Sequence, residues 1–110
     1  MVTVQFTDPF KRRLKQLAKR YRSIKTDLQP VLQQLQAGDF IGDQITGLNA
    51  TAFKARIRNS DIPTGKSGGY RLIYQILSPS SIALLVIYAK SEQVDINADE
   101  IKALLIKSSG

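Results

Sequence analysis

The architecture of this chain can be inferred from three segments: Phe53-Lys-Ala-Arg-Ile-Arg58, Gly69-Tyr-Arg-Leu-Ile-Tyr74 and Ile82-Ala-Leu-Leu-Val-Ile-Tyr-Ala89. In the first segment apolar and cationic residues alternate, and a β-strand turns successive side chains to opposite faces of its sheet. One face of this strand is therefore expected to be buried, while the other carries Lys54, Arg56 and Arg58. The third segment is apolar on both faces, which is typical of a strand in the centre of a sheet.

The N-terminal region is predicted to form a short strand followed by a helix. Val2, Val4 and Phe6 alternate with polar residues, which is the pattern of a strand with one buried face. Asp8 can accept hydrogen bonds from the free backbone N–H groups at a helix start, and Pro9 suits the first helical position. Apolar residues at helical spacing then continue to residue 21.

A second helix is predicted from the same apolar spacing between Ile24 and Leu35. Thr26 and Gln29 resemble a capping box, so Pro30 is expected in the first turn, where its missing N–H is tolerated. Gly38 is a suitable residue for ending this helix. The similar apolar stripes of the two helices predict an antiparallel helical hairpin that packs on a sheet.

The remaining segments complete the predicted fold. Residues 38–52 are expected to form a loop and residues 70–77 a strand, and Asn97 with Glu100 predicts the start of a last helix. Residues 1–110 are thus expected to form a single α+β domain in the order β-α-α-β-β-β-α. The helical hairpin and the C-terminal helix are expected to pack on a mainly antiparallel four-stranded sheet.

The composition narrows the possible function classes. A chain of 110 residues that is 43% hydrophobic suits one folded domain. Its 16 Lys and Arg residues outnumber its 9 Asp and Glu residues, and a net charge of +7 favours nucleic acid, an anionic membrane or an acidic protein as partner. Residues 11–25 are rich in cations and contain no acidic residue, so Lys11, Arg12 and Lys15 are candidate RNA-binding residues.

The chain contains no cysteine and no histidine. Disulfides and thiolate metal sites are therefore excluded, and the commonest general base and metal ligand is missing. We expect no metal and no small-molecule cofactor. The longest apolar run, residues 82–89, is too short to span a bilayer, and the N-terminus lacks the pattern of a signal peptide. A cytoplasmic protein without a membrane partner is expected.

Thr64-Gly-Lys-Ser67 resembles the end of a phosphate-binding loop, but Ser60 stands where that motif requires glycine. The motif also needs a strand before it and a helix after it, whereas a strand is expected to follow here. The simpler interpretation is a turn within the long connection of residues 59–69, from which Lys66 can still reach an anion.

The row of Lys54, Arg56 and Arg58 has two interpretations. It can be a solvated sheet face or an edge protected by charge, or it can bind an anion that relieves the repulsion among its cations. An RNA backbone is the obvious candidate for that anion. Arg71 favours the second interpretation, because a guanidinium on an otherwise apolar strand face needs a partner, and Arg71 joins the row if the two strands are neighbours.

Three further residues near these strands are candidates for the same site. Lys90 can join the cationic cluster, and Glu92 can hold the cluster in place or act as a base. The alternative for both is an ordinary charged strand end. Tyr70 can stack on a base or simply fill the core.

Together these segments resemble a known family. Lys54-Ala-Arg-Ile-Arg58, Gly68-Gly-Tyr-Arg-Leu-Ile-Tyr74 and the strand end Ile87-Tyr-Ala-Lys-Ser-Glu92 are similar to the RelE/ParE toxin superfamily. The order of elements is similar to that family over nearly the whole chain. The turn Gly65-Lys-Ser-Gly-Gly69 and the strand end look most like the HigB-type branch.

This resemblance implies a toxin of a bacterial type II toxin–antitoxin system. RelE-like members inhibit translation by cutting mRNA in the ribosomal A site, where a ribose 2′-hydroxyl attacks the adjacent phosphate. Lys and Arg residues of the middle strands neutralise the developing charge and help to move protons. By position, Lys54, Arg56 and Arg71 match the basic catalytic positions of the family.

Two departures from the family leave the general base and the general acid open. Lys90 lies beside the next basic position of the family, which is Ser91 here, and Ile96 stands near the place of a tyrosine that is catalytic in some members. The candidate catalytic residues are Lys54, Arg56, Arg71, Lys90 and Glu92. The candidate RNA-binding residues are Arg58, Lys66, Tyr70, Lys11, Arg12 and Lys15.

Two functions of different classes remain open. The first is a ribosome-dependent endoribonuclease, an mRNA interferase, whose partners are mRNA, the ribosome with its rRNA, and a cognate antitoxin. The second is a non-catalytic protein: either a ParE-like inhibitor that binds gyrase or a degenerate toxin that only binds its antitoxin. The intact set of Lys54, Arg56 and Arg71 favours the endoribonuclease.

Overall fold

A computed structural model of the chain describes residues 1–62, 68–92 and 95–107. Within these ranges the elements are β1 (Thr3–Phe6), α1 (Asp8–Arg20), α2 (Ile24–Gln36), β2 (Asp43–Gln44), β3 (Thr51–Ile57), β4 (Tyr70–Ser78), β5 (Ser81–Ala89) and α3 (Ala98–Leu104). The predicted α+β class is confirmed. No helix in the described ranges is long and apolar enough to cross a membrane.

The sheet differs from the prediction in having five strands instead of four, in the order β1-β5-β4-β3-β2. β1 pairs with β5 in parallel, and the other neighbouring pairs are antiparallel. The additional strand, β2, lies within residues 38–52, where the sequence predicts a loop. Two residues are too few to show an alternating pattern, so nothing in their composition distinguishes them from a loop.

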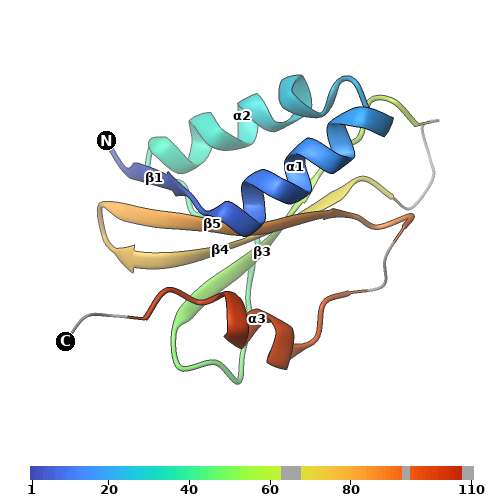
Figure 1. The fold of residues 1–110 in the computed structure, drawn as a ribbon. Coiled ribbons are helices and arrows are strands. Elements are labelled where there is room, and N and C mark those ends of the chain that lie inside the picture. The colour runs from blue at the N-terminus through green and yellow to red at the C-terminus, as the bar shows by residue number, and fades with distance from the viewer. Residues whose placement is uncertain (63–67, 93–94, 108–110) are drawn as a thin grey trace.

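The hairpin of α1 and α2 covers one face of the sheet, and α3 lies against the other face (Figure 1). The larger core lies between the hairpin and the sheet and includes Phe10, Leu72 and Leu84. A smaller core beneath α3 includes Leu85 and Ile101. Because α3 has only seven residues and β4 and β5 have nine each, α3 covers only part of its face.

The start of α1 differs by one residue from the prediction. Thr7 caps the helix instead of Asp8, because the Thr7 hydroxyl oxygen accepts a hydrogen bond of 3.4 Å from the Phe10 N–H. The same hydroxyl donates a hydrogen bond of 2.7 Å to the carbonyl oxygen of Leu84 on β5. The cap therefore also ties the helix start to the sheet, which a sequence pattern cannot reveal.

The ends of the other helices follow the predicted capping chemistry in part. α2 begins at Ile24, so Pro30 lies inside the helix and not in its first turn. Thr26 is exposed, and water can therefore satisfy the carbonyl group that Pro30 leaves free. Gly38 follows the end of α2 with a φ of +90°, and Asn97 caps α3, both as predicted.

Candidate nucleic-acid interface

Four of the predicted cations lie together on the face of the sheet that α3 leaves open. β3 and β4 are neighbours, so Arg71 joins the cationic row as predicted, and the register places it directly opposite Arg56. Lys54 lies on the same face two residues before Arg56, and Lys90 follows the end of β5. A pocket with a volume of about 210 Å³, here called the cationic pocket, is lined by Asp43, Lys54, Arg56, Arg71, Lys90 and Asp95.

A single carboxylate oxygen holds both lysines of the cationic pocket. Asp95 Oδ1 lies 3.0 Å from Lys90 Nζ and 3.7 Å from Lys54 Nζ. The same oxygen accepts a hydrogen bond of 3.0 Å from the hydroxyl of Tyr88. The hydrogen bond from Lys90, followed by that from Tyr88, holds the pKa of Asp95 below its usual value. Asp95 is therefore ionised at neutral pH.

Tyr88 supplies a hydroxyl donor from beneath the cationic pocket. Its side chain is fully buried on β5, and its nearest residue across the strand pair is Arg71. Burial, followed by the hydrogen bond to Asp95, raises the pKa of Tyr88 to about 12. The hydroxyl therefore keeps its proton at neutral pH and can act only as a donor toward an anion.

The two arginines of the cationic pocket lie opposite each other on the paired strands β3 and β4. In the described part of the chain no carboxylate forms an ion pair with Arg56 or Arg71. Arg71 Nη1 donates hydrogen bonds to the carbonyl oxygens of Gly68, at 3.0 Å, and Tyr70, at 3.2 Å. Like charges directly opposite each other on neighbouring strands are destabilising. A bound anion between the two guanidinium groups would relieve this repulsion.

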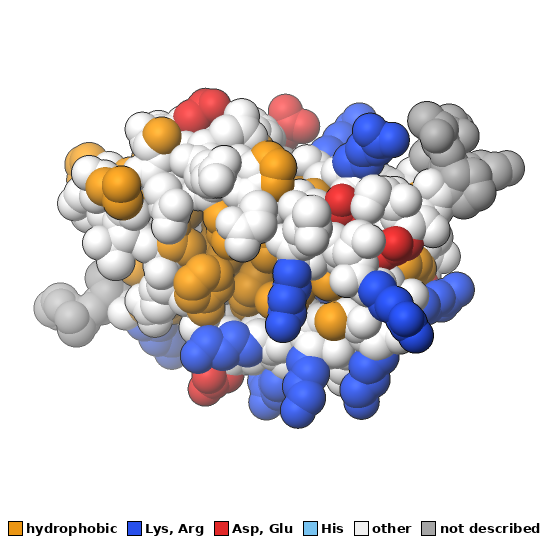
Figure 2. All heavy atoms as spheres, turned by 90° about the horizontal axis from the view of Figure 1, so that it is seen from above, with side chains coloured by type: hydrophobic (Ala, Val, Ile, Leu, Met, Phe, Trp, Pro, Cys, Tyr) orange, Lys and Arg blue, Asp and Glu red, His pale blue; other side chains and the backbone are white. Residues whose placement is uncertain are grey.

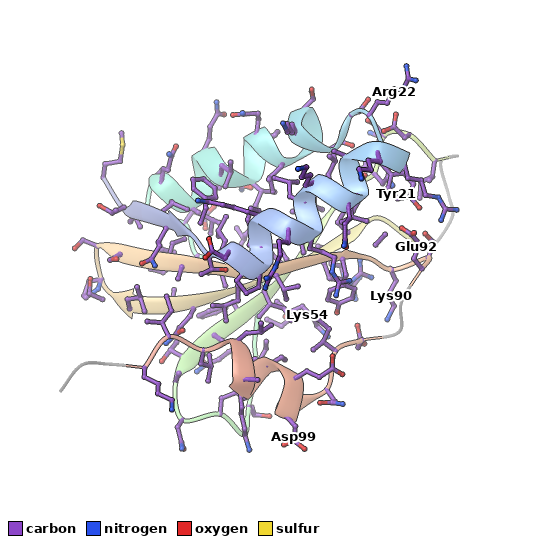
Figure 3. All side chains as sticks on the ribbon, viewed as in Figure 1. Tyr21, Arg22, Lys54, Lys90, Glu92 and Asp99 are labelled. Atoms are coloured by element: carbon purple, nitrogen blue, oxygen red, sulfur yellow. The ribbon has the colours of Figure 1, made fainter. Side chains whose placement is uncertain are left out.

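Glu92 lies outside the cationic pocket, contrary to the prediction. Its Oε1 atom lies 2.9 Å from Nη1 of Arg20 on α1. Figure 3 shows Lys90 and Glu92 pointing to opposite sides of the chain at the end of β5. The backbone turns here, with the Glu92 N–H bonded to the carbonyl oxygen of Ala89, so strand alternation no longer applies. Glu92 cannot support the cluster or act as its base from this position.

Two of the predicted RNA-binding residues, Arg58 and Tyr70, do not line the cationic pocket. Tyr70 is fully buried in the larger core and packs edge-on against Tyr21 with ring centroids 5.8 Å apart, so the prediction that it stacks on a base is wrong. Burial also raises the pKa of its hydroxyl. Arg58 is exposed just beyond β3 and does not line the pocket. Lys66 lies outside the described residues.

The cations of α1 form a separate surface. Lys11, Arg12, Lys15 and Lys19 are all exposed, and we call them the α1 row. Lys11, Lys15 and Lys19 follow one another at intervals of four residues and therefore lie along one side of the helix. Figure 2 shows the helix-covered face, with Lys and Arg side chains gathered along one margin. This helix packs on the face of the sheet opposite to the cationic pocket.

Three residues of the site were not predicted from the sequence. Tyr88 carried a usable signal, because it precedes Lys90 by two residues and strand alternation places both on one face. Asp43 falls in the short strand β2, opposite Lys54. Asp95 lies between β5 and α3 in an irregular segment, where no spacing rule applies.

Comparisons with known proteins do not assign a family. No protein-family model matches the chain, and no curated protein matches it. Within the described ranges no group of three or more Asp and Glu side chains is arranged to hold a metal ion. The function must therefore be inferred from the cationic pocket itself.

Proposed function

We propose that this protein is a toxin of the RelE type that cleaves mRNA on the ribosome, with the cationic pocket binding the scissile phosphate. The observation that carries this proposal is the convergence of Lys54 and Arg56 from β3, Arg71 from β4 and Lys90 from the end of β5. Four cations and two carboxylates line the pocket, so it retains a positive charge suited to a phosphodiester.

The proposed reaction needs positioned charge more than any other catalytic group. The 2′-oxygen of a ribose forms a bond to the adjacent phosphorus, and the bond from phosphorus to the 5′-oxygen breaks. The products are a 2′,3′-cyclic phosphate and a 5′-hydroxyl end. Negative charge increases on the phosphate oxygens in the transition state, and fixed guanidinium and ammonium groups stabilise it.

Two proton transfers accompany this reaction. The 2′-hydroxyl loses a proton, and the leaving 5′-oxygen gains one. The carboxylate of Asp43 can accept the first proton, and the ammonium groups of Lys54 and Lys90 can donate the second. Tyr88 keeps its own proton and contributes a hydrogen bond to the anion instead.

The arrangement of charges supports a binding site over a solvated sheet face. Arg56 and Arg71 are direct neighbours on paired strands, which costs stability unless an anion binds between them. Arg71 is also held in place, because its guanidinium group donates hydrogen bonds to the carbonyl oxygens of Gly68 and Tyr70. The proposed toxin also requires a cytoplasmic antitoxin partner, and acidic groups on that partner would complement the cationic pocket.

Primer extension on mRNA after expression in bacteria tests the proposal. Wild-type protein should produce cuts within translated codons. The double variant Arg56→Ala, Arg71→Ala should reduce cutting at least about 100-fold, because losing one charge-stabilising donor typically costs that much. The matched double variant Lys25→Ala, Lys107→Ala removes the same charge from exposed positions outside the pocket and should cut like the wild type.

The other outcomes of this experiment are equally informative. DNA damage without mRNA cuts would replace the proposal with a ParE-like inhibitor of gyrase. Absence of both effects would indicate a chain that only binds its antitoxin. Unchanged cutting by the folded Arg56→Ala, Arg71→Ala variant would show that the cationic pocket is not the site.

A further inference from the structure

The three groups that contact Asp95 Oδ1 belong to or adjoin the sheet, whereas Asp95 does not. Lys54 lies on β3, Tyr88 on β5, and Lys90 directly after β5. Asp95 belongs to the irregular segment before α3, and its side chain is 46% exposed. The positions of the donors are therefore set by strand pairing, while the acceptor reaches them from outside the sheet.

We infer that Lys54, Lys90 and Tyr88 form a subsite for a phosphate oxygen, and that the Asp95 carboxylate occupies this subsite when no nucleic acid is bound. The assignment rests on the proposed function for its ligand, a phosphodiester. It adds to that function a third donor, the Tyr88 hydroxyl, and a residue of the chain itself that competes with the substrate.

The chemistry of the donors supports this exchange. Carboxylate and phosphate oxygens accept charge-assisted hydrogen bonds from the same groups at similar distances. The hydroxyl of Tyr88 is attached to a fully buried side chain, so leaving it without an acceptor is costly. A phosphate oxygen in the place of Asp95 Oδ1 keeps this hydrogen bond and both lysine contacts.

Asp95 can leave the subsite more easily than the donors can move. Its side chain is about half exposed, so water can solvate the carboxylate once it is displaced. Repulsion between the carboxylate and an incoming phosphate also favours displacement. Asp95 therefore lowers the affinity of the cationic pocket for anions. An anion present at a high enough concentration replaces the carboxylate.

Asp43 provides a matched control for this competition. It lines the same pocket from β2 and is the backbone partner of Lys54. In the described part of the chain no ion pair or hydrogen bond joins its carboxylate to the two lysines or to Tyr88. Removing Asp43 changes the charge of the pocket as much as removing Asp95 does, but it does not empty the proposed subsite.

Titration of the purified 110-residue chain with inorganic sulfate, followed by NMR, tests the assignment. Sulfate should bind Asp95→Ala roughly tenfold or more tightly than wild type, because a unit charge close to the bound anion is removed. Asp43→Ala should give at most a third of that gain. Tyr88→Phe, added to Asp95→Ala, should lose most of the gain. Asp95→Asn, which keeps the size of the side chain, should give a smaller gain than Asp95→Ala.

Two results would overturn the assignment. Equal tightening by Asp95→Ala and Asp43→Ala would show only a general effect of charge. Sulfate binding by Asp95→Ala that is unchanged or weaker would show that Asp95 does not compete with the anion. The backbone spectrum of each variant identifies any that fails to fold, and Asp95→Asn then serves in place of Asp95→Ala.

This experiment is independent of RNA cleavage, because sulfate contains no bond that the proposed enzyme breaks. If sulfate binding changes as expected but no mRNA is cut, the subsite stands and the proposed function fails. If mRNA is cut but Asp95→Ala binds sulfate no better than wild type, the subsite fails and the proposed function stands.

Discussion

The cationic pocket and the α1 row carry charge of the same sign but are built differently. The pocket collects cations from three strands, and two of them share the carboxylate of Asp95. The α1 row comes from one helix, and its side chains all extend into solvent. Several pocket cations can contact one phosphate, whereas a helical row can contact only successive phosphates of a backbone. Convergence, more than charge, therefore distinguishes a site that can perform chemistry from a surface that can only bind.

The two surfaces should also respond differently to substitutions. The cationic pocket depends on the pairing of several strands, whereas the α1 row lies on a single helix. A backbone change that separates two strands should therefore disturb the pocket and leave the row intact. Changes to exposed lysines should do the opposite.

The largest effect, a loss in the free energy of unfolding, is expected from Gly42→Ala. A Cβ atom at Gly42 would lie 2.4 Å from the carbonyl oxygen of Lys54, and its φ of +103° is strained for alanine. Gly38 also has a positive φ, of +90°, but its added Cβ would meet no atom within 4 Å. We expect the free energy of unfolding, measured with urea, to fall by about 3 kcal/mol for Gly42→Ala and about 1 kcal/mol for Gly38→Ala.

The same two variants test whether RNA cleavage depends on the position of β2 beside the cationic pocket. Moving β2 away from β3 displaces Asp43 and Lys54, so Gly42→Ala should lose RNA cleavage at a temperature where it remains folded. Gly38→Ala should keep it. Equal losses of stability in the two variants would contradict the close approach of β2 to β3 on which the pocket depends.

A smaller effect, on RNA binding, is expected from substitutions in the α1 row. About five neutralised phosphates give a slope of roughly −3 to −4 when the logarithm of the binding constant is plotted against the logarithm of salt concentration. Lys11→Ala combined with Lys15→Ala should reduce the size of this slope by about 1.4 and weaken binding without abolishing it. Fluorescence anisotropy with a labelled single-stranded RNA measures both. A flat salt response of the wild-type protein would contradict binding to a nucleic-acid backbone.

The sequence predicted the parts of the fold that depend on local patterns. Alternation placed Lys54 and Arg56 on one face, and it placed Arg71 in the same row on condition that the two strands are neighbours, which they are. Asn97 was identifiable as a cap because its side chain bonds within its own turn. The sequence predicted Asp8 as the cap of α1, but Thr7 is the cap. The Thr7 hydroxyl is also held by a hydrogen bond to Leu84, which lies far away in the chain.

The errors in the site arise where strand alternation ends or where it does not decide between the two faces of the sheet. Glu92 was misplaced because the chain turns after β5 and alternation ends there. Tyr70 was ambiguous because both faces of β4 carry apolar residues, and only the position of the helices decides which face is the larger core. Asp95 could not be found, because its contacts depend on how an irregular segment returns to the sheet.

Locating the bound nucleic acid directly is the sharpest test of the difference between the two surfaces. An NMR titration with a short DNA oligomer, which lacks the 2′-hydroxyl nucleophile and so remains intact, reports on side chains of both surfaces at once. We predict saturable shifts of the guanidinium signals of Arg56 and Arg71 and of the ammonium signal of Lys90. Shifts confined to the α1 row, with the signals of the cationic pocket unchanged, would contradict the assignment of the pocket as the site that binds the phosphate.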